Sequence, residues 1–228
     1  MKRPVEKMCG VLRVSTSGYY DWIDREPSRT KQENFRVCIT DSNHDLPKAP
    51  NLLNQDFKVD APYKVWVTDI TQIVTPDGKA YLATIKDIFH KEIVGWAIAN
   101  HMRTELRLEA LKNAVMKHRP PKGLIHHSDQ GGQYCSKEYI EALDGYGMVR
   151  SMSRRGNCWD NAPAESFFST IKSERIYHKN YKGFDEMRQD IFWYIECFYN
   201  RNRRHSAIGN LTPAEYLKRY YENYKIAA

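Results

Sequence analysis

The chain has 228 residues, of which 35 are Lys or Arg and 28 are Asp or Glu, giving a formal net charge of +7 and a pI near 9.1. Hydrophobic residues make up 41% of the sequence, which is enough for a folded core. No apolar run reaches the roughly 18 residues of a membrane-spanning helix, so the composition excludes a disordered chain and a transmembrane protein.

The sequence also indicates the compartment and the class of partner. The first residues, Met1–Glu6, are not followed by the apolar segment of a secretory signal, so we expect a cytoplasmic protein. The five cysteines are scattered without a Cys-x-x-Cys pair, which fits free thiols better than a disulfide framework or a cysteine-rich zinc site. The moderate positive charge is compatible with an anionic partner such as nucleic acid but does not decide it.

The beginning of the chain predicts two regions without a large core. In residues 1–25, two short apolar repeats at helical spacing flank a hydroxyl-rich break, which indicates two short helices. These helices fit a helix-turn-helix and a simple helical hairpin equally well. Residues 26–61 are rich in proline, asparagine and aspartate, so we predict a linker or extended arm, with a brief strand at 37–40.

From residue 62 the pattern is that of an α/β domain. Alternating β-branched and aromatic residues predict strands at 64–74, 80–89 and 92–99, the first two joined by a tight turn. A helix capped by Thr104 then runs to about residue 118. We predict the later elements as a strand at 123–127, a helix at 136–146, a strand at 148–152, and helices at 162–175, at 183–200 and from residue 213.

This order of elements predicts the fold class. Three consecutive strands followed by alternating helices and strands indicate an α/β, RNase H-like fold, with a mixed five-stranded sheet flanked by helices and a small helical segment before it. We place the catalytic core at residues 62–180 and a helical extension packed on it at 181–228.

Three carboxylates occupy positions that this topology brings together. Asp69 lies in the middle of the first strand, Asp129 follows the fourth strand, and Glu165 is in the first turn of the helix that Pro163 starts. Carboxylates at strand ends and a helix start predict a site for two Mg²⁺ ions, or Mn²⁺ in their place, which suits phosphoryl transfer. Taken alone, Glu165 could serve the helix dipole and Asp129 could form a turn, whereas Asp69 has no comparable structural explanation.

Basic and polar residues near Glu165 predict contacts with DNA phosphates. A lysine seven residues after Glu165 projects from the same helix face, and an arginine-containing loop precedes that helix. The arginines that end the aromatic helix could bind phosphate or serve the helix dipole. We expect DNA contacts from Lys172, Arg154, Arg155, Asn161, Arg201, Arg203 and Arg204.

Other candidates have structural explanations that are at least as good. Asp87 could supplement the three acids or could simply end the second strand. His126 and His127 are adjacent in a strand and point to opposite faces, so at most one reaches the site, and zinc is not expected. The aromatic side of the helix at 183–200 predicts core packing rather than base stacking.

Five motifs carry a resemblance to a known family: Thr40–Pro47, Val65–Thr71, His126–Asp129, Gly156–Pro163 and Tyr199–Arg201. They resemble the second-reading-frame (OrfB) transposases of the IS-three (IS3) group of bacterial insertion sequences, whose core is similar to retroviral integrases. The similarity covers about residues 37 to 220. The 59 and 35 residues that separate Asp69, Asp129 and Glu165 match the family's D,D-35-E pattern, so the resemblance implies that these acids form its metal-binding catalytic triad.

The resemblance also implies a function and partners. DNA, a first-frame OrfA protein and further copies of the chain are the implied partners, and no membrane is involved. Family members carry a further helical DNA-binding segment where this chain has only residues 26–36, which indicates an internal deletion. Gln72 and Gln130–Gly132 also depart from the usual residues.

We therefore predict a DNA transposase that cleaves and joins phosphodiesters at insertion-sequence ends. One alternative is a truncated DNA-binding remnant that regulates a full-length transposase. The other is a stand-alone RNase H-like nuclease.

Overall fold

The computed structural model describes residues 15, 17, 46–154 and 157–227. Most of the predicted helical segment 1–25, the arm up to residue 45 with its strand at 37–40, and Arg155 lie outside the described residues. The strands and helices named below belong to the unit formed by residues 39–228. Within the described residues, no helix has both the length and the apolar character needed to cross a membrane.

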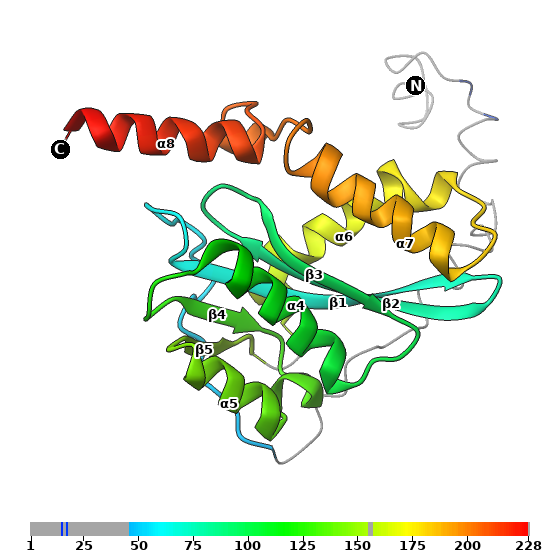
Figure 1. The fold of residues 1–228 in the computed structure, drawn as a ribbon, viewed down its shortest axis with the longest axis horizontal. Coiled ribbons are helices and arrows are strands. Elements are labelled where there is room, and N and C mark those ends of the chain that lie inside the picture. The colour runs from blue at the N-terminus through cyan, green and yellow to red at the C-terminus, as the bar shows by residue number, and fades with distance from the viewer. Residues whose placement is uncertain (1–14, 16, 18–45, 155–156, 228) are drawn as a thin grey trace, which may run out of the picture. The chain divides into compact units, whose positions relative to one another are not determined.

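A mixed five-stranded sheet forms the centre of this unit (Figure 1). The strands are β1 (Val65–Thr75), β2 (Gly78–Asp87), β3 (Ile93–Ala99), β4 (Ile125–Ser128) and β5 (Val149–Met152). Their order is β3-β2-β1-β4-β5, with β1 antiparallel to β2, β2 antiparallel to β3, and β1, β4 and β5 parallel. The predicted RNase H-like sheet is confirmed, because alternating apolar residues and tight turns already specify the three antiparallel strands.

Helices cover both faces of the sheet (Figure 1). α4 (Thr104–His118) and α5 (Lys137–Gly145) lie on one face, and α6 (Ala162–Glu174) and α7 (Phe184–Phe192) lie on the other. The described chain ends with α8 (Pro213–Ala227). The short helical elements are η1 (Gly132–Cys135), η2 (Cys158–Asn161), η3 (Ile176–His178), the π-helix η4 (Trp193–Tyr199) and η5 (Ser206–Ile208).

Two helices differ in detail from their predictions. The single helix expected at 183–200 consists of α7 followed by the π-helix η4. Its end is tied to β3, because the side-chain amide of Asn200 accepts from Ile93 N at 2.9 Å and donates to Ile93 O at 3.0 Å. Thr104 begins α4 without capping it, since its hydroxyl accepts a hydrogen bond from Arg107 Nη2 instead.

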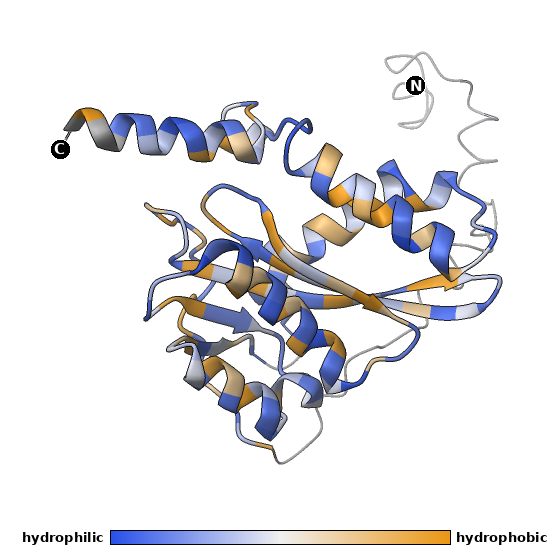
Figure 2. Cartoon of the chain, in the orientation of Figure 1, coloured by the Kyte–Doolittle hydropathy of each residue, from blue (hydrophilic) through white to orange (hydrophobic). Residues whose placement is uncertain are grey.

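The sheet separates the two largest apolar clusters of the described residues, one on each face. Trp66 and Ile70 of β1 pack with α4 and α5, whereas Ile73 packs with α6, α7 and η4. Figure 2 shows both hydrophobic and hydrophilic residues along α4 to α7, while α8 is mostly hydrophilic. Because side chains alternate along a strand, Asp69 lies on the same face of β1 as Ile73, toward α6.

A buried polar network closes the end of the sheet where β2 turns into β3. Asp87 Oδ2 accepts from Tyr63 N at 2.8 Å and from Trp66 Nε1 at 3.1 Å. The Nδ1 atom of His90 lies 3.0 Å from Asp87 Oδ1, and its Nε2 lies 2.9 Å from Glu92 Oε2. Asp87 shares the face of Trp66, opposite that of Asp69, so of its two predicted roles the structure shows the strand-end one.

The network predicts a pH-dependent contribution of His90 to stability. Burial alone would lower the pKa of His90, but the contacts with Asp87 and Glu92 outweigh burial and raise the pKa to about 9. The histidine pKa in the unfolded chain is near 6.5. The folded state therefore binds this proton more tightly, and the stabilisation is complete below about pH 6.5 and disappears as the pH rises through 9.

The test is the difference in the free energy of unfolding between the wild type and His90→Gln. Urea unfolding should show the wild type more stable by about 2–3 kcal/mol at pH 6, with the difference shrinking between about pH 6.5 and 9 and nearly absent above it. The comparison with the variant is needed because burial lowers the pKa of Lys86 to about 7, which acts in the opposite direction over the same pH range. A difference that stays constant from pH 6 to pH 10 would contradict this prediction.

Candidate active site

The parallel register of β1 and β4 sets two of the predicted acids side by side. Val67 pairs with His127, and Asp69 and Asp129 each follow two residues later along the same strand direction. Asp69 Oδ1 accepts a hydrogen bond from Ile70 N at 2.7 Å. Asp129 Oδ1 accepts one from Gly131 N at 2.9 Å in the turn that follows β4. The two carboxylates therefore lie on one face at neighbouring strands.

The start of α6 brings the third acid to this face. Ala164 packs against Val67 of β1, which fixes the first turn of α6 over the strand that carries Asp69. Glu165, the next residue, is exposed, and Lys172 lies seven residues later and is partly buried. The structure thus brings together the three predicted acids and the predicted lysine.

The charges of these four residues act on one another. Burial raises the pKa of Asp69 well above its usual range, and the negative charges of Asp129 and Glu165 add to this rise against the opposing effects of Ile70 N and Lys172. Burial and Asp129 likewise raise the pKa of Glu165. Burial lowers the pKa of Lys172, and the charge of Asp69 counteracts it. The site therefore carries unbalanced negative charge that a cation would relieve.

The carboxylates do not yet converge on one point. Among residues 46–154 and 157–227, no three His, Cys, Asp or Glu side chains are arranged to hold a metal ion. Like charges repel, and Asp69 and Asp129 each turn one oxygen to a backbone amide. Their oxygens are nevertheless the hard donors that Mg²⁺ prefers, so the chemistry of the donor set fits the ion.

Asp160, which the sequence analysis did not single out, anchors the loop before α6. Its side chain is fully buried and accepts hydrogen bonds from Asn51 Nδ2 at 2.9 Å, from Gln55 Nε2 at 2.8 Å and from Arg154 Nη2 at 2.8 Å. The hydrogen bonds from Arg154 contribute most to holding the pKa of Asp160 well below its usual range. The carboxylate therefore joins the arm before the core to the segment that positions Glu165.

Two more buried polar residues hold the first turn of α6. Asn161 is 3% exposed, and its Nδ2 donates to Thr68 O at 3.2 Å. Lys86 is 5% exposed, and its Nζ donates to Pro163 O at 3.1 Å. Nothing in the sequence around Lys86 indicates its role. Asp160, in contrast, lies inside the motif Gly156–Pro163, and that position is a sequence signal for a role at the site.

The residues expected to contact DNA differ in their exposure and in their hydrogen-bond partners. Arg154 is bound to Asp160, and Arg203 is bound to Glu174 through Nε at 2.9 Å. Arg201 and Arg204 are exposed at the end of η4, as a phosphate contact requires. Asn161 needs a correction, because its side chain is turned into the fold against β1 rather than toward the surface.

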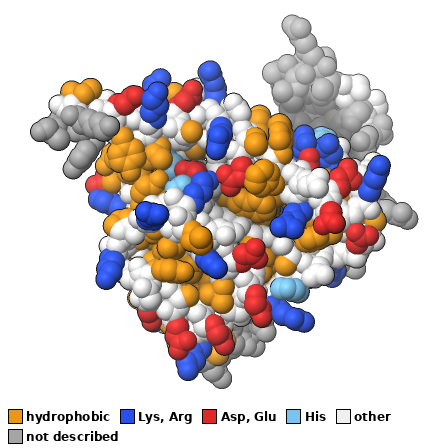
Figure 3. All heavy atoms as spheres, viewed as in Figure 1, with side chains coloured by type: hydrophobic (Ala, Val, Ile, Leu, Met, Phe, Trp, Pro, Cys, Tyr) orange, Lys and Arg blue, Asp and Glu red, His pale blue; other side chains and the backbone are white. Residues whose placement is uncertain are grey.

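The face of the molecule in Figure 3 has no dominant basic patch. Lys and Arg side chains are spread over this view and alternate with Asp and Glu. The net positive charge is therefore not concentrated there, and this face of the described residues does not mark a path for DNA.

The two histidines lie on opposite faces, as predicted, and both are held by hydrogen bonds. His126 Nε2 lies 3.2 Å from Tyr139 OH on the α5 side. His127 is on the side of the acids, with Nδ1 2.8 Å from Ser151 Oγ and Nε2 3.0 Å from Asp160 O. Burial lowers the pKa of His126 to about 3 and that of His127 to about 4, so both are neutral.

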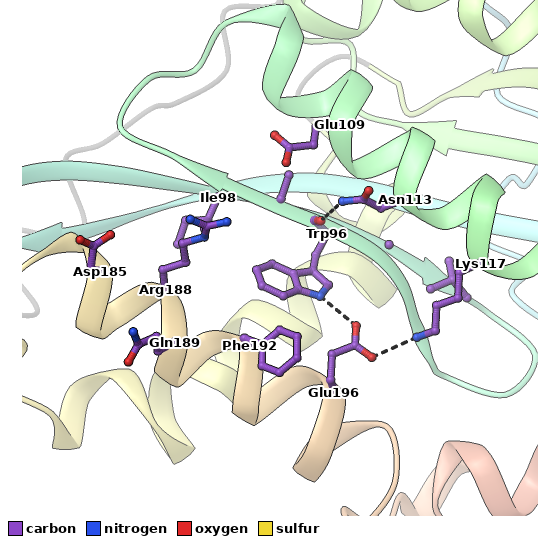
Figure 4. Close-up of a pocket in the computed structure, with 13 residues that line it drawn as sticks. Trp96, Ile98, Glu109, Asn113, Lys117, Asp185, Arg188, Gln189, Phe192 and Glu196 are labelled. Carbon is purple, nitrogen blue, oxygen red and sulfur yellow. Dashed lines mark hydrogen bonds and ion pairs between the residues drawn. The ribbon is translucent and has the colours of Figure 1, made fainter.

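A pocket of about 570 Å³ lies away from the acids, between β3, α4 and the α7–η4 segment (Figure 4). Glu196 crosses it, accepting from Trp96 Nε1 and from Lys117 Nζ, each at 3.0 Å. Asn113 Nδ2 donates to Trp96 O at 3.2 Å. Its lining contains none of the three acids, so this pocket is separate from the candidate active site.

The family follows from comparison with known sequences. Two family models for an integrase core domain match residues 59–158 and 146–213. An uncharacterized 31 kDa protein of insertion element IS600 from Shigella sonnei is 40% identical, over 94% of this chain and 99% of that protein. Transposase InsF of insertion sequence IS3A from Escherichia coli K12 is 32% identical, over 93% of each chain. The chain belongs to the transposases of the IS3 group.

Solved structures agree with the fold of this transposase. The magnesium complex of the HTLV-2 integrase catalytic core domain covers 68% of the transposase and 97% of that core, with a TM-score of 0.53 and 17% identity. A chain of a simian T-cell lymphotropic virus intasome covers 93% of the transposase, with a TM-score of 0.59 and 13% identity. At such low identity the likeness establishes the RNase H-like fold of retroviral integrases and nothing more.

The transposase is shorter than the relatives it matches. Its alignment with the IS600 protein extends over 269 positions, although the chain has only 228 residues. At least 41 of those positions therefore have no counterpart in this chain, as an internal deletion would produce.

Proposed function

We propose that Asp69, Asp129 and Glu165 are the catalytic residues of this transposase and that they act on phosphodiesters at the ends of its insertion sequence. The observation that supports this most strongly is the β1–β4 register, which sets Asp69 beside Asp129. The raised pKa of Asp69, to which both other acids contribute, supports the same grouping. Family membership supplies the reaction, and the fold supplies the positions of the groups.

The three carboxylates would hold two Mg²⁺ ions, or Mn²⁺ in their place. The ions would supply Lewis-acid stabilisation of the charge that develops at phosphorus. Asp69 lies in β1, Asp129 directly follows the adjacent strand β4, and Glu165 comes from a helix turn anchored by Asp160. The protein's contribution is thus to keep three acids in fixed relative positions despite their repulsion.

The expected reaction has two steps at phosphorus. Water first attacks a phosphodiester at the element end, and the departing oxygen becomes a free 3′-hydroxyl. That hydroxyl then attacks a second phosphodiester and displaces another 3′-oxygen, so no covalent bond to the protein is formed. Lys172, whose charge acts on Asp69, would hold a phosphate at the acids, and Arg201 and Arg204, which are exposed, would contact phosphates farther along the DNA.

The partners follow from the same proposal. The transposase would bind both insertion-sequence end and target DNA, as a homo-oligomer and together with a first-frame OrfA protein, in the cytoplasm where bacterial DNA lies. Because the contacts with DNA are mainly with phosphates, the affinity should fall steeply with salt.

A strand-transfer assay tests the function. The purified chain is incubated with labelled duplexes carrying the flanking inverted repeats and Mg²⁺, with and without the OrfA protein. We expect cleavage and joining by the wild type and a loss of about a thousandfold in Asp129→Asn, since a lost metal ligand removes several kcal/mol of transition-state stabilisation. Asp185→Asn, an exposed acid on α7, is the matched control and should remain active.

Two results would contradict the proposal. Normal joining by Asp129→Asn would remove that acid from the catalytic set. Cleavage without joining, on DNA that lacks the element ends, would indicate a nuclease instead of a transposase.

A further inference from the structure

One buried oxygen next to β1 has no hydrogen-bond partner among the described residues. Asn161 is 3% exposed, and its Oδ1 atom, which is fully removed from solvent, makes no hydrogen bond to the part of the chain that the structure describes. The other end of the same amide is held, because Nδ2 donates to Thr68 O at 3.2 Å. A buried acceptor without a donor destabilises the folded state, so a ligand that donates a hydrogen bond to it would be bound more favourably.

Asn161 lies at a helix start, where its side-chain oxygen would ordinarily have a hydrogen-bond donor. Asn161 is the N-cap residue of α6, where an asparagine oxygen ordinarily accepts from a backbone amide of the first turn. In this helix Asn161 makes no such bond, and the side chain is instead turned to β1. Its contact there is the carbonyl of Thr68, the residue before Asp69, while Glu165 follows four residues later in α6.

The Oδ1 atom of Asn161 is a hydrogen-bond acceptor, so its ligand must be a hydrogen-bond donor. An amide carbonyl is a neutral hard acceptor, which neither adds to the negative charge of the three acids nor competes with them for a proton. Mg²⁺ keeps several of its waters when one or two carboxylates hold it, and these waters are strong hydrogen-bond donors. Partners of this kind orient the ligands of a metal site.

We propose that Asn161 is a positioning residue of the catalytic ion site, and that its Oδ1 accepts a hydrogen bond from a water of the divalent ion held by Asp69 and Asp129. This inference rests on the proposed function, because it needs an ion at the acids. It replaces the DNA contact first expected of this residue. It also explains why the side chain of Asn161 bonds β1 and does not cap α6.

The test is Mn²⁺ binding by the purified full chain, measured by electron paramagnetic resonance of the free ion without DNA. Asn161→Leu removes the oxygen and should raise the dissociation constant by about 10-fold or more. Asn161→Asp keeps an oxygen there but removes the donor to Thr68, and should bind Mn²⁺ at least as tightly as the wild type. Asn200→Leu is the matched control, since Asn200 is equally buried, its amide is fully bonded to Ile93, and it should leave the Mn²⁺ affinity unchanged.

Melting curves without metal show that each variant is folded before binding is measured. Wild-type affinity in Asn161→Leu would overturn the inference. So would an equal loss in Asn161→Leu and Asn161→Asp, because the donor to Thr68 and not the oxygen would then be the cause. Failure of the proposed function is a separate result, namely Mn²⁺ binding that survives in Asp129→Asn.

Discussion

Asp69→Asn is expected to abolish DNA cleavage and joining while making the metal-free protein more stable. The loss of activity should reach about a thousandfold, since the variant lacks the central carboxylate of the site. The gain in stability should be about 1–2 kcal/mol, because burial and the charges of Asp129 and Glu165 make the Asp69 carboxylate unfavourable in the folded state.

The sign of the pH dependence gives an independent check of this prediction. The folded-state pKa of Asp69 is raised above its unfolded value, so the folded state binds the proton more tightly. The unfavourable contribution is absent in acid and grows as the pH rises from about 4 through the raised pKa. Wild-type stability should therefore fall over this range by more than that of Asp69→Asn, as measured by urea unfolding.

Added metal should make the wild type more stable than Asp69→Asn. Mg²⁺ or Mn²⁺ stabilises only a folded state that binds it, so the melting temperature of the wild type should rise with the ion and that of Asp69→Asn should not. Asp185→Asn serves again as the exposed-acid control. A variant that is less stable than the wild type without metal would show that Asp69 is a structural residue.

Asp87→Ala is expected to cause the largest loss of stability, about 3–5 kcal/mol. Asp87 is completely buried and accepts hydrogen bonds from the backbone amide of Tyr63 and the indole of Trp66. Its removal leaves these donors unpaired and leaves the buried charge of His90 with only Glu92. Urea unfolding followed by tryptophan fluorescence measures the effect.

The same variant tests whether the role of Asp87 is structural or catalytic. Asp60→Ala is the control, because Asp60 is exposed and its ion pair with Lys64 lies on the surface, so its loss should change stability little. If Asp87 is structural, folded Asp87→Ala should bind Mn²⁺ as the wild type does. Weakened ion binding with unchanged stability would instead place Asp87 at the catalytic site.

The elements and the acids of this transposase follow from local patterns. Alternation of apolar residues in β1 marks both the strand and the exceptional Asp69, because a charged side chain on a buried face needs a specific partner. Pro213 begins the last helix, as predicted, and Ser136 caps α5, as shown by the bond from Tyr139 N to its hydroxyl. Such features depend on neighbours within a few residues, which is why periodicity and capping rules find them.

The surroundings of the site depend on residues that are far apart in the chain. Asn51 and Asp160 meet across 109 positions, and Lys86 reaches Pro163 across 77. Arg203 resembles a DNA contact by its place in a basic cluster, yet it is bound to Glu174, 29 positions away. No local pattern encodes such pairs, because each residue would be equally suited to solvent if its partner were elsewhere.

The sequence of this transposase therefore determines which acids are candidates for catalysis and in which elements they lie, since strand alternation and helix starts are local properties of the chain. Only the tertiary structure decides how these acids are brought near one another, through the pairing of Val67 with His127 and the anchoring of α6 by Asp160. The same is true of Asn161, which by residue type is an ordinary helix cap. Packing against β1 turns its side chain inward and leaves its oxygen without a hydrogen bond to the described residues, because the cost of one missing hydrogen bond is small compared with the gain from burying the whole helix.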